Sequence, residues 1–265
     1  MAAGGEPLMF FTSVWHFFAS SANWQGGKGI PQRTLEQLQY SGIALAIAVL
    51  IGLPLGLLVG HTGRGDLVST IANTLRGLPG YGLLVFFVIV FSNPFKGKTD
   101  LPYIVPTEIV LIILAIPGIM ANTTAGVQNV DPQVRDAARG MGMRGLQVLR
   151  RVEFPIALPL IFSGLRNASL QVFATATVAA QIGLGGLGRY IIDGIQQGLY
   201  FSETAPGAVL VAALALIIDL LWALATRLIV SRGLTGHYRR APTPLVTMAP
   251  SVTVRRGDST AQTAA

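Results

Sequence analysis

Residues 37–63 read QLQYSGIALAIAVLIGLPLGLLVGHTG, 27 consecutive residues without Asp, Glu, Lys or Arg. A helix crosses the hydrocarbon core of a bilayer, about 30 Å thick, with about 20 mostly apolar residues. This run is long enough to do so. It must cross as a helix, because lipid offers backbone groups no hydrogen-bond partner. We therefore expect a first membrane span at about residues 39–60.

Four further runs of this kind follow along the chain. Charge-free segments cover residues 77–95, 109–130 and 167–188, and a fourth from 204 to 226 is interrupted only by Asp219. They predict spans at about residues 72–92, 104–126, 156–180 and 206–230. We expect an all-α, polytopic membrane protein with about five transmembrane helices, since a transmembrane β-barrel would show short segments of alternating polarity.

The composition of the 265-residue chain agrees with this class. Hydrophobic residues make up 51% of it and charged residues 12%, against about 25% charged residues in soluble domains. The chain has no cysteine, which excludes a disulfide scaffold and a thiolate metal site, and its histidines are too scattered for a metal site. The net charge of +7 is typical of basic cytoplasmic loops in so apolar a chain, so we expect no nucleic-acid partner.

The basic residues divide unequally between the two sides of the five-span arrangement. Twelve lie in the loop after the first span, the loop after the third span and the C-terminal tail, whereas five lie on the other side. Loops rich in Lys and Arg remain in the cytoplasm. The sequence therefore predicts an outside N-terminus and a cytoplasmic C-terminus.

The chain divides into three expected regions: an N-terminal segment at 1–35, a transmembrane domain at 36–232 and a cytoplasmic tail at 233–265. Residues 7–22 are apolar and aromatic but short for a span. We interpret them as an interfacial helix on the outer leaflet, with a sixth span as the alternative. The tail is rich in Pro, Thr and Ala without hydrophobic periodicity, which predicts disorder.

Two glycine patterns need separate interpretations. Residues 183–188 fit the written form of a dinucleotide fingerprint, but that site needs a preceding strand and a βαβ unit. Here a membrane run precedes it, so we interpret it as a turn where a helix leaves the membrane. Gly52, Gly56 and Gly60 form a small-residue face for close helix packing. Its partner helix could belong to this chain or to a second subunit.

The loop between the third and fourth spans, residues 131–159, is the most informative. Asp131 is a good N-cap and Pro132 a good first helical residue. The helix they begin would end near Gly140 or Gly142, since glycine favours helix C-termini, and Gly142 would adopt a positive φ.

A second short helix is expected from residue 145 to about 152, and Pro155 opens the next span. Helices this short are not stable alone. The loop therefore either rests on a partner or is an ordinary basic loop held near anionic headgroups, and the residues alone leave both open.

The same loop resembles the EAA loop of ABC importer permeases. Asp136-Ala137-Ala138, Gly142 and Val152-Glu153-Phe154-Pro155 match the family's Glu-Ala-Ala, Gly and Ile-x-Leu-Pro at the same spacing, with Asp for Glu, Val for Ile and Phe for Leu. The resemblance implies the type I permease fold with a cytoplasmic coupling helix that docks on an ATPase subunit. We expect the residues of this ATPase-coupling loop to be Arg135, Asp136, Ala137, Ala138, Arg139, Gly142, Arg144 and Pro155.

Segments 60–65, 138–143, 174–177 and 182–188 are similar to osmoprotectant permeases, and the likeness covers about residues 23–235. It implies the permease subunit of a bacterial inner-membrane importer for glycine betaine, choline, carnitine or proline betaine. The implied partners are an ATP-binding cassette ATPase dimer, a second permease subunit, identical or homologous, an extracytoplasmic solute-binding protein and the lipid bilayer. It implies no cofactor, and the chain carries no ATP-binding motif, so we expect no enzymatic activity of its own.

Two alternatives remain at this point. A permease for amino acids or methionine would share the loop. A secondary transporter or channel would instead be expected to have inverted repeats or intramembrane charge pairs. Only Arg166 and Asp219 are candidates for such a pair, and Arg166, near the inner leaflet, could simply extend toward the interface.

Polar residues in the fourth span suggest a translocation path. Asn167, Gln171, Ala174 and Thr175 share one face at helical spacing, and polar residues at membrane depth usually face a protein interior or a water-filled path. We interpret this face as the lining of the path. Thr175 has the alternative of bonding only its own helix.

Overall fold

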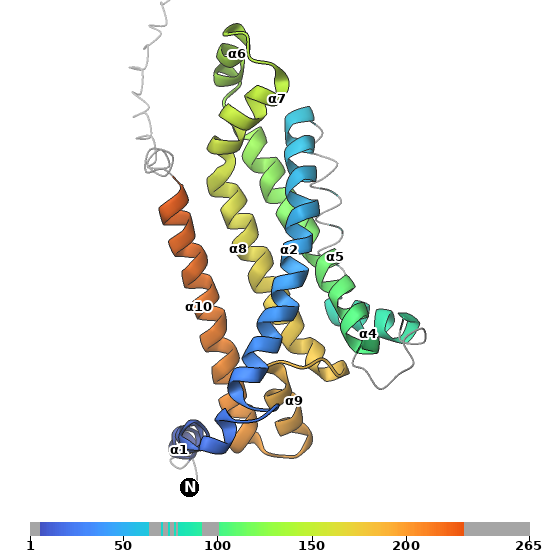
Figure 1. Ribbon diagram of the computed structural model, residues 1–265, viewed down its shortest axis with the longest axis vertical. Coiled ribbons are helices and arrows are strands. Elements are labelled where there is room, and N and C mark those ends of the chain that lie inside the picture. Colours follow the sequence, from blue (N-terminus) through green and yellow to red (C-terminus); the bar gives the residue numbers. More distant parts are fainter. Residues whose placement is uncertain are drawn as a thin grey trace, which may run out of the picture.

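The computed structural model describes residues 6–63, 79–91 and 101–230, together with residues 70, 74 and 77. Every regular element in this part of the chain is a helix, which confirms the expected all-α class. Four long helices run side by side along the molecule (Figure 1). They are α2 (Ile30–Thr62), α5 (Leu101–Gln128), α8 (Phe154–Ala179) and α10 (Ala205–Ile229).

Shorter helices gather at the two ends of this bundle. At one end, called here the α6 end, lie α6 (Pro132–Gly140) and α7 (Gly145–Val148). At the opposite, α9 end lie α1 (Glu6–Ala19) and α9 (Gly188–Gln196), and α4 (Gly80–Phe91) packs against α5. Single turns of 3-10 or π helix complete the order: Ser21–Trp24, Leu149–Glu153, Ala180–Ile182 and Tyr200–Thr204.

Three helical segments are long and apolar enough to cross a membrane: Ile30–Thr62, Leu101–Gln128 and Ser202–Ile229. They contain the spans predicted at 39–60 and 104–126, and all but the last residue of the span predicted at 206–230. The fourth predicted span corresponds to α8, whose 26 residues have the length to cross, although α8 is not one of these three segments. Of the span predicted at 72–92, the structure describes the apolar helix α4. Most of its earlier part lies outside the described residues, as does the tail at 233–265.

Helix α1 runs across the bundle rather than along it (Figure 1). Its 14 residues extend about 21 Å at 1.5 Å per residue, less than the hydrocarbon core of about 30 Å. This geometry suits the interfacial helix expected within residues 7–22. The expected boundary at residue 35 falls inside α2, which begins at Ile30 with a proline in its first turn.

The glycine face of α2 packs against α5 of the same chain. A Cβ added at Gly52, Gly56 or Gly60 would lie 3.2, 2.8 or 2.7 Å from a Cβ atom of α5. Those atoms belong to Ile119, Thr123 and Val127, which repeat with the same four-residue spacing. The Thr124 hydroxyl also donates to the Gly56 carbonyl at 3.1 Å. The question left open by the sequence is thus answered: the small residues serve contact within the chain.

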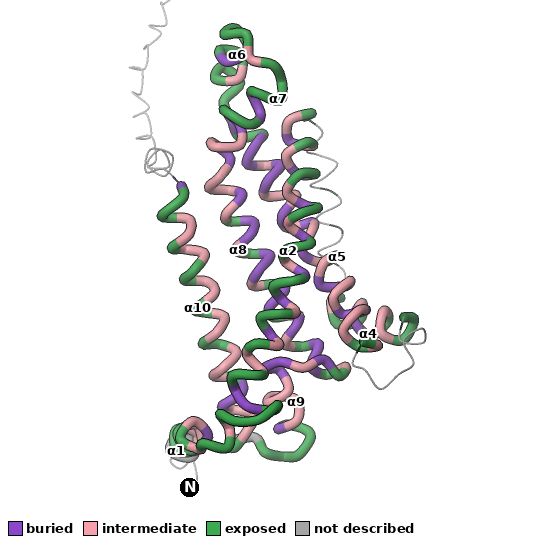
Figure 2. The backbone as a smooth tube through the Cα atoms, viewed as in Figure 1, coloured by how far each residue is buried: buried purple, intermediate pink, exposed green. Residues whose placement is uncertain are grey.

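The buried core lies between α2, α5 and α8, as the purple segments in Figure 2 show. Small and branched residues such as Ala44, Leu111, Ala115 and Val172 fill it. Helix α10 contributes little to this core, and the most apolar stretch of its segment is 0% buried. The described part of a single chain therefore leaves most of α10 to lipid or to another subunit.

The glycine-rich segment 183–188 is a turn between α8 and α9, as interpreted from the sequence. Gly183 and Gly186 have φ angles of +107° and +91°, which other residues rarely adopt. The Gly186 amide donates to the Glu36 carboxylate at 2.9 Å, and a side chain at Gly186 would collide with Gln37. These glycines allow the turn to lie directly on the first turns of α2.

Candidate functional site

The loop at the α6 end is built from local signals in the sequence. The Asp131 carboxylate accepts a hydrogen bond from the Gln133 amide at 2.8 Å, so Asp131 is the N-cap of α6, with Pro132 as its first residue. The helix closes where the Met143 amide donates to the Ala138 carbonyl at 3.2 Å. Gly142 has a φ of +84°, as predicted.

The tip of this loop exposes both charged and apolar side chains. Asp136 and Arg139 form an exposed pair, 3.7 Å apart. Met141 and Leu146 beside them are 72% and 58% exposed, as is typical of a surface that a partner protein covers. Of the predicted loop residues, the exposed ones are Asp136, Ala137, Arg139, Gly142 and Arg144, whereas Arg135, Ala138 and Pro155 face the bundle or lie partly within it.

A buried carboxylate joins this loop to the bundle. Glu153, in the π-helical turn Leu149–Glu153, is 1% exposed. One carboxylate oxygen lies 2.7 Å from His61 Nδ1, and the other lies 3.0 Å from Arg135 Nε. Arg135 also donates to the Val127 carbonyl of α5. The ends of α2 and α5, the start of α8 and the first turn of α6 therefore meet at one carboxylate.

Sequence reasoning did not single out this cluster. Glu153 entered only as the variable residue of the Ile-x-Leu-Pro pattern. His61 entered as a histidine too isolated for a metal and as part of the segment 60–65, with no partner assigned to it. A usable signal was present, since Glu153 stands between the apolar residues Val152 and Phe154. A carboxylate so placed needs a cation if it is buried. Which cation it would meet depends on tertiary packing.

The predicted path residues of α8 lie on one uncovered face. Asn167, Gln171 and Ala174 are exposed, and Thr175 is partly exposed. The Thr175 hydroxyl donates to the Gln171 carbonyl of its own helix at 2.8 Å, the bond expected of a threonine within a helix. No described element of the chain packs over this face. It is a polar surface that the described part of the chain leaves open.

The same face leads to an open, largely apolar pocket near the α9 end. The pocket has a volume of about 390 Å³ and lies where α4, α8 and α9 approach one another. Its lining residues are Tyr81, Thr177, Val178, Gln181, Ile191 and Ile192. Val178, which lines this pocket, lies one helical turn after Ala174 of the polar face.

An ion pair links α8 to α10. Arg166 Nε lies 2.5 Å from one carboxylate oxygen of Asp219, and Arg166 Nη2 lies 2.6 Å from the other. This is the two-pronged geometry that makes arginine–carboxylate pairs strong. The interpretation of Arg166 as a residue reaching for the interface is therefore wrong. It binds its neighbour helix, and each charge neutralises the other.

Residues 48–232 match the family model described as the binding-protein-dependent transport system inner membrane component. The chain belongs to this family. It is 34% identical over 206 residues to the glycine betaine/carnitine/choline transport system permease protein OpuCB of Bacillus subtilis, covering 77% of this chain and 90% of that one. It is 33% identical to the osmoprotectant import permease protein OsmW of Salmonella typhimurium, covering 70% and 85%. These matches confirm the resemblance drawn from the EAA-like loop.

Solved structures show the same fold. An inward-facing structure of the MetNI methionine ABC transporter matches with a TM-score of 0.65 and 22% identity, covering 74% of this chain and 94% of that chain. A second crystal form of that transporter matches with a TM-score of 0.61. The chain therefore has the type I ABC importer permease fold. Within the described residues, no group of three or more His, Cys, Asp or Glu side chains could hold a metal ion.

Proposed function

We propose that the chain is the permease subunit of a bacterial ABC importer that moves osmoprotectants such as glycine betaine, choline, carnitine or proline betaine inward. The observation that carries this proposal is 32–34% identity, over most of both chains, to permeases named for choline, carnitine, glycine betaine or osmoprotectants. A permease for methionine or other amino acids is the second candidate. The likeness to the methionine transporter, at 22% identity, supports the fold alone.

The proposed orientation puts the α6 end in the cytoplasm and the α9 end outside. It rests on the twelve basic residues on the α6 side against five on the other. The exposed tip of the α6–α7 loop then faces the cytoplasm, where an ATPase dimer would bind it. A solute-binding protein would approach the α9 end, and a second permease subunit would cover the open face of α8.

We assign the transmission of force to the Glu153 cluster. A push on α6 moves Arg135, and Arg135 is tied through Glu153 to His61 at the end of α2. The same glutamate directly precedes α8, which carries the proposed path residues. Closure of the ATPase dimer would therefore shift α2 and α8 together rather than bend the loop alone.

The chemistry of the path suits a solute without net charge. The face of α8 offers the amides of Asn167 and Gln171 and the hydroxyl of Thr175, which provide dipoles but no fixed charge. An anionic solute would require a basic side chain to bind it along the path, and the charge of Arg166 is already neutralised by Asp219. A betaine carries both charges and needs only weak polar contacts on its way.

The proposed function is tested by expressing the chain with its neighbouring transporter genes in a strain that lacks osmoprotectant uptake. Uptake of labelled glycine betaine, choline, carnitine and methionine is measured, together with growth at high osmolarity. Import of at least one quaternary amine with rescue of growth is the expected result. Import of methionine alone would refute the substrate class and leave the permease assignment intact.

Substituting Gly142 with valine is expected to weaken docking of the ATPase. The glycine has a φ of +84°, and an L residue in that conformation costs about 1–2 kcal/mol. The loop end would relax to another geometry and displace the exposed tip. Co-purification of the ATPase and transport should both fall, while membrane insertion is unchanged. The matched control is Gly140→Ala, where φ is not positive and nothing lies near the added Cβ; equal ATPase binding by the two variants would contradict the docking role.

Substituting Ala174 with tryptophan is expected to block transport without loosening the subunit complex. Ala174 is exposed on the polar face of α8, and added volume there would fill a narrow path. The control is Leu216→Trp on α10, where the side chain is 70% exposed. Uptake is measured in vesicles containing equal amounts of assembled complex. If the Ala174→Trp variant takes up solute at the parental rate, this face of α8 does not line the path.

A further inference from the structure

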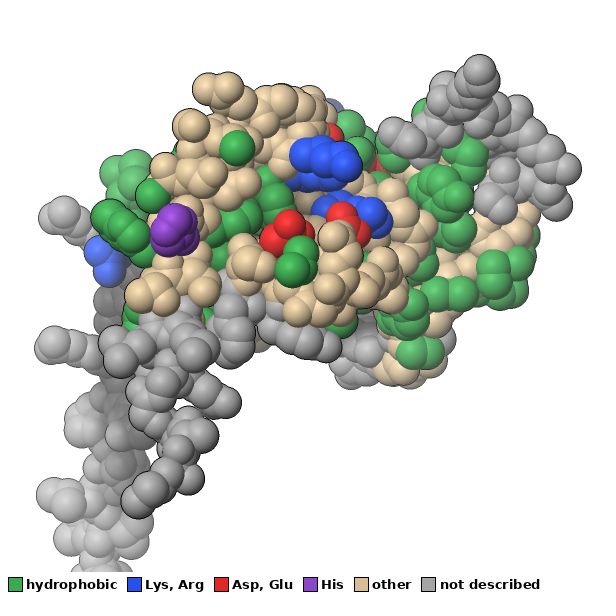
Figure 3. Space-filling model, turned by 90° about the horizontal axis from the view of Figure 1, so that it is seen from below, with side chains coloured by type: hydrophobic (Ala, Val, Ile, Leu, Met, Phe, Trp, Pro, Cys, Tyr) green, Lys and Arg blue, Asp and Glu red, His purple; other side chains and the backbone are tan. Residues whose placement is uncertain are grey.

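A polar pocket of about 340 Å³ opens at the α9 end of the molecule. It lies where the segment after α1, the start of α2, α9 and the turn Tyr200–Thr204 meet. Seen from this end, basic and acidic side chains surround a hollow in the surface (Figure 3). This volume falls in the range of small-molecule sites, about 300–1,000 Å³.

Two glycines explain why the walls of this pocket can come together. A Cβ added at Gly194 of α9 would lie 2.8 Å from the Thr204 amide nitrogen, so only glycine lets α9 pack on that turn. A Cβ added at Gly207 of α10 would lie 2.7 Å from Tyr190 Cβ. Helix α9 is thereby drawn against α10, and Glu203 is brought beside the polar side of α9.

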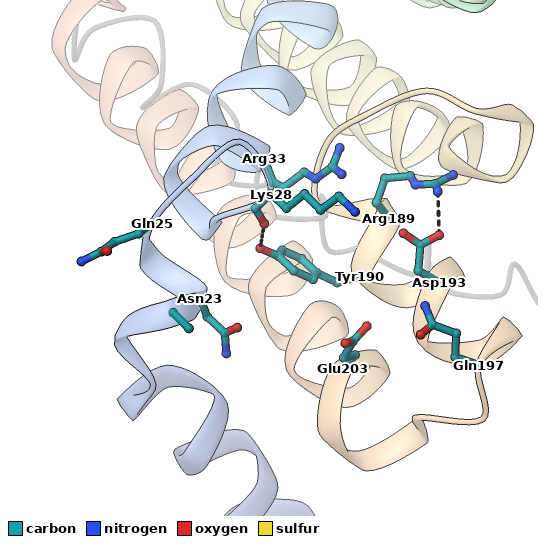
Figure 4. Close-up of a pocket in the computed structure, with 10 residues that line it drawn as sticks. Asn23, Gln25, Lys28, Arg33, Arg189, Tyr190, Asp193, Gln197 and Glu203 are labelled. Carbon is teal, nitrogen blue, oxygen red and sulfur yellow. Dashed lines mark hydrogen bonds and ion pairs between the residues drawn. The ribbon is translucent and has the colours of Figure 1, made fainter.

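Tyr190 lies at the centre of the pocket and is held there by two contacts. Its hydroxyl donates to the Lys28 carbonyl at 2.5 Å, and its ring packs edge-on against Phe17 with centroids 5.4 Å apart. Burial raises the pKa of the Tyr190 phenol, so it remains a neutral hydrogen-bond donor at physiological pH. In Figure 4 its ring lies between Lys28 on one side and Glu203 on the other.

Most charges around the pocket neutralise one another. Arg189 pairs with Asp193 at 2.8 Å, and Arg33 pairs with Glu36 at 3.1 Å. Lys28 and Glu203 also line the pocket, yet neither forms an ion pair with any described residue. The pocket therefore offers one positive and one negative group, with an aromatic ring between them.

We propose that this pocket binds a small zwitterion, with the carboxylate of the solute toward the Lys28 ammonium and its quaternary ammonium toward Glu203 and the Tyr190 ring. The identity of the solute class and the outward orientation of the α9 end rest on the proposed function. A quaternary ammonium cannot donate hydrogen bonds, so a carboxylate and an aromatic face are its natural partners. The site gives the permease its own contact with solute at the outer surface.

Binding at this site is weak, because Lys28 is exposed to water and Glu203 is only partly buried. Exposed ion pairs contribute about 0.2–1 kcal/mol, so removing one charge should weaken solute binding by up to about fivefold. Weak retention suits a transporter, since a tightly held solute would not move on.

The experiment uses the assembled complex in lipid nanodiscs without the solute-binding protein. Binding of glycine betaine and of choline is followed by saturation-transfer difference NMR of their N-methyl protons. Lys28→Met should weaken glycine betaine binding by up to about fivefold and leave choline binding unaffected, because choline has no carboxylate. Glu203→Gln should weaken both. The conservative variants Lys28→Arg and Glu203→Asp should bind like the parent.

The outcomes separate this site from the proposed function. If the parental complex binds neither glycine betaine nor choline, or if all charge variants bind them equally, the proposed site is refuted. So would variants that bind solute normally but bind the solute-binding protein less tightly, because the pocket would then be a docking surface. Failure of the parental complex to import any quaternary amine would instead refute the proposed function.

Discussion

Substituting Glu153 with glutamine is expected to destabilise the permease and to uncouple ATP hydrolysis from transport. The carboxylate is 1% exposed and faces two basic side chains, His61 at 2.7 Å and Arg135 at 3.0 Å. Removing one partner of a buried ion pair costs about 3–5 kcal/mol, because the remaining charge stays buried and uncompensated. The side chains of His61 and Arg135 are 23% and 21% exposed. Water therefore screens their charges in part, and we expect a stability loss near the lower end of this range, about 3 kcal/mol.

The readout has a thermodynamic and a functional part. Thermal unfolding of the purified complex reports the stability loss. The ratio of solute imported to ATP hydrolysed in vesicles reports coupling. The matched control is Arg139→Gln, which breaks the exposed pair with Asp136 in the same loop and should change stability by less than about 1 kcal/mol.

A double-substitution cycle tests whether the cluster acts as a unit. Arg135→Gln and Glu153→Gln share one contact, so their combined effect on stability should be clearly smaller than the sum of the separate effects. Additive effects, or a Glu153→Gln variant with the parental import-to-hydrolysis ratio, would remove Glu153 from the coupling route. A loss of stability with normal coupling would leave it a purely structural residue.

The sequence predicted those features whose signals are local. Span lengths follow from charge-free runs, so α5 at Leu101–Gln128 and α10 at Ala205–Ile229 lie close to their predicted spans. The cap at Asp131 and the positive φ of Gly142 follow from residue types at a helix start and end. In each case the residues that decide the structure are neighbours in the chain.

Contacts between residues far apart in the chain were predicted poorly. His61 and Glu153 are 92 positions apart, and nothing in the sequence indicated that they meet. Arg166 and Asp219, 53 positions apart, were identified only as candidates for a charge pair, and the structure shows that they form one. Helix α9 was also missed, because a short amphipathic helix outside the apolar runs gives no signal at membrane-span length. Its polar side forms the pocket at Tyr190, which sequence reasoning could not assemble.

The uncovered face of α8 shows a different limit of prediction from the sequence. The spacing of Asn167, Gln171 and Ala174 predicted a shared face, and the three side chains are exposed together. No described element of the chain covers this face, so the chain alone does not specify what the face contacts. Arg166 illustrates the reverse case, since its partner lies within the chain and cancels its charge.

Substituting Gly56 with valine is expected to disrupt the packing of α2 on α5 and to reduce the amount of folded protein sharply. An added Cβ would lie 2.8 Å from Thr123 Cβ and 3.0 Å from the Met120 carbonyl oxygen, and the latter is backbone that cannot rotate away. Overpacking of this kind costs about 1–3 kcal/mol. Separating the helices also removes the hydrogen bond from Thr124 to the Gly56 carbonyl, worth about another 1 kcal/mol.

The control must separate this clash from the general effect of valine in a membrane helix. Gly42 provides it, because it lies in the same helix and an added Cβ there meets nothing within 4 Å. Thermal unfolding and the amount of assembled complex are compared for Gly42→Val and Gly56→Val. The first should resemble the parent, whereas the second should unfold several degrees lower or fail to accumulate. Gly52 and Gly60 face the same seam at 3.2 and 2.7 Å, so Gly60→Val should repeat the loss and Gly52→Val should show a milder one. Equal stability of the Gly42 and Gly56 variants would mean that α5 is not held against this face of α2.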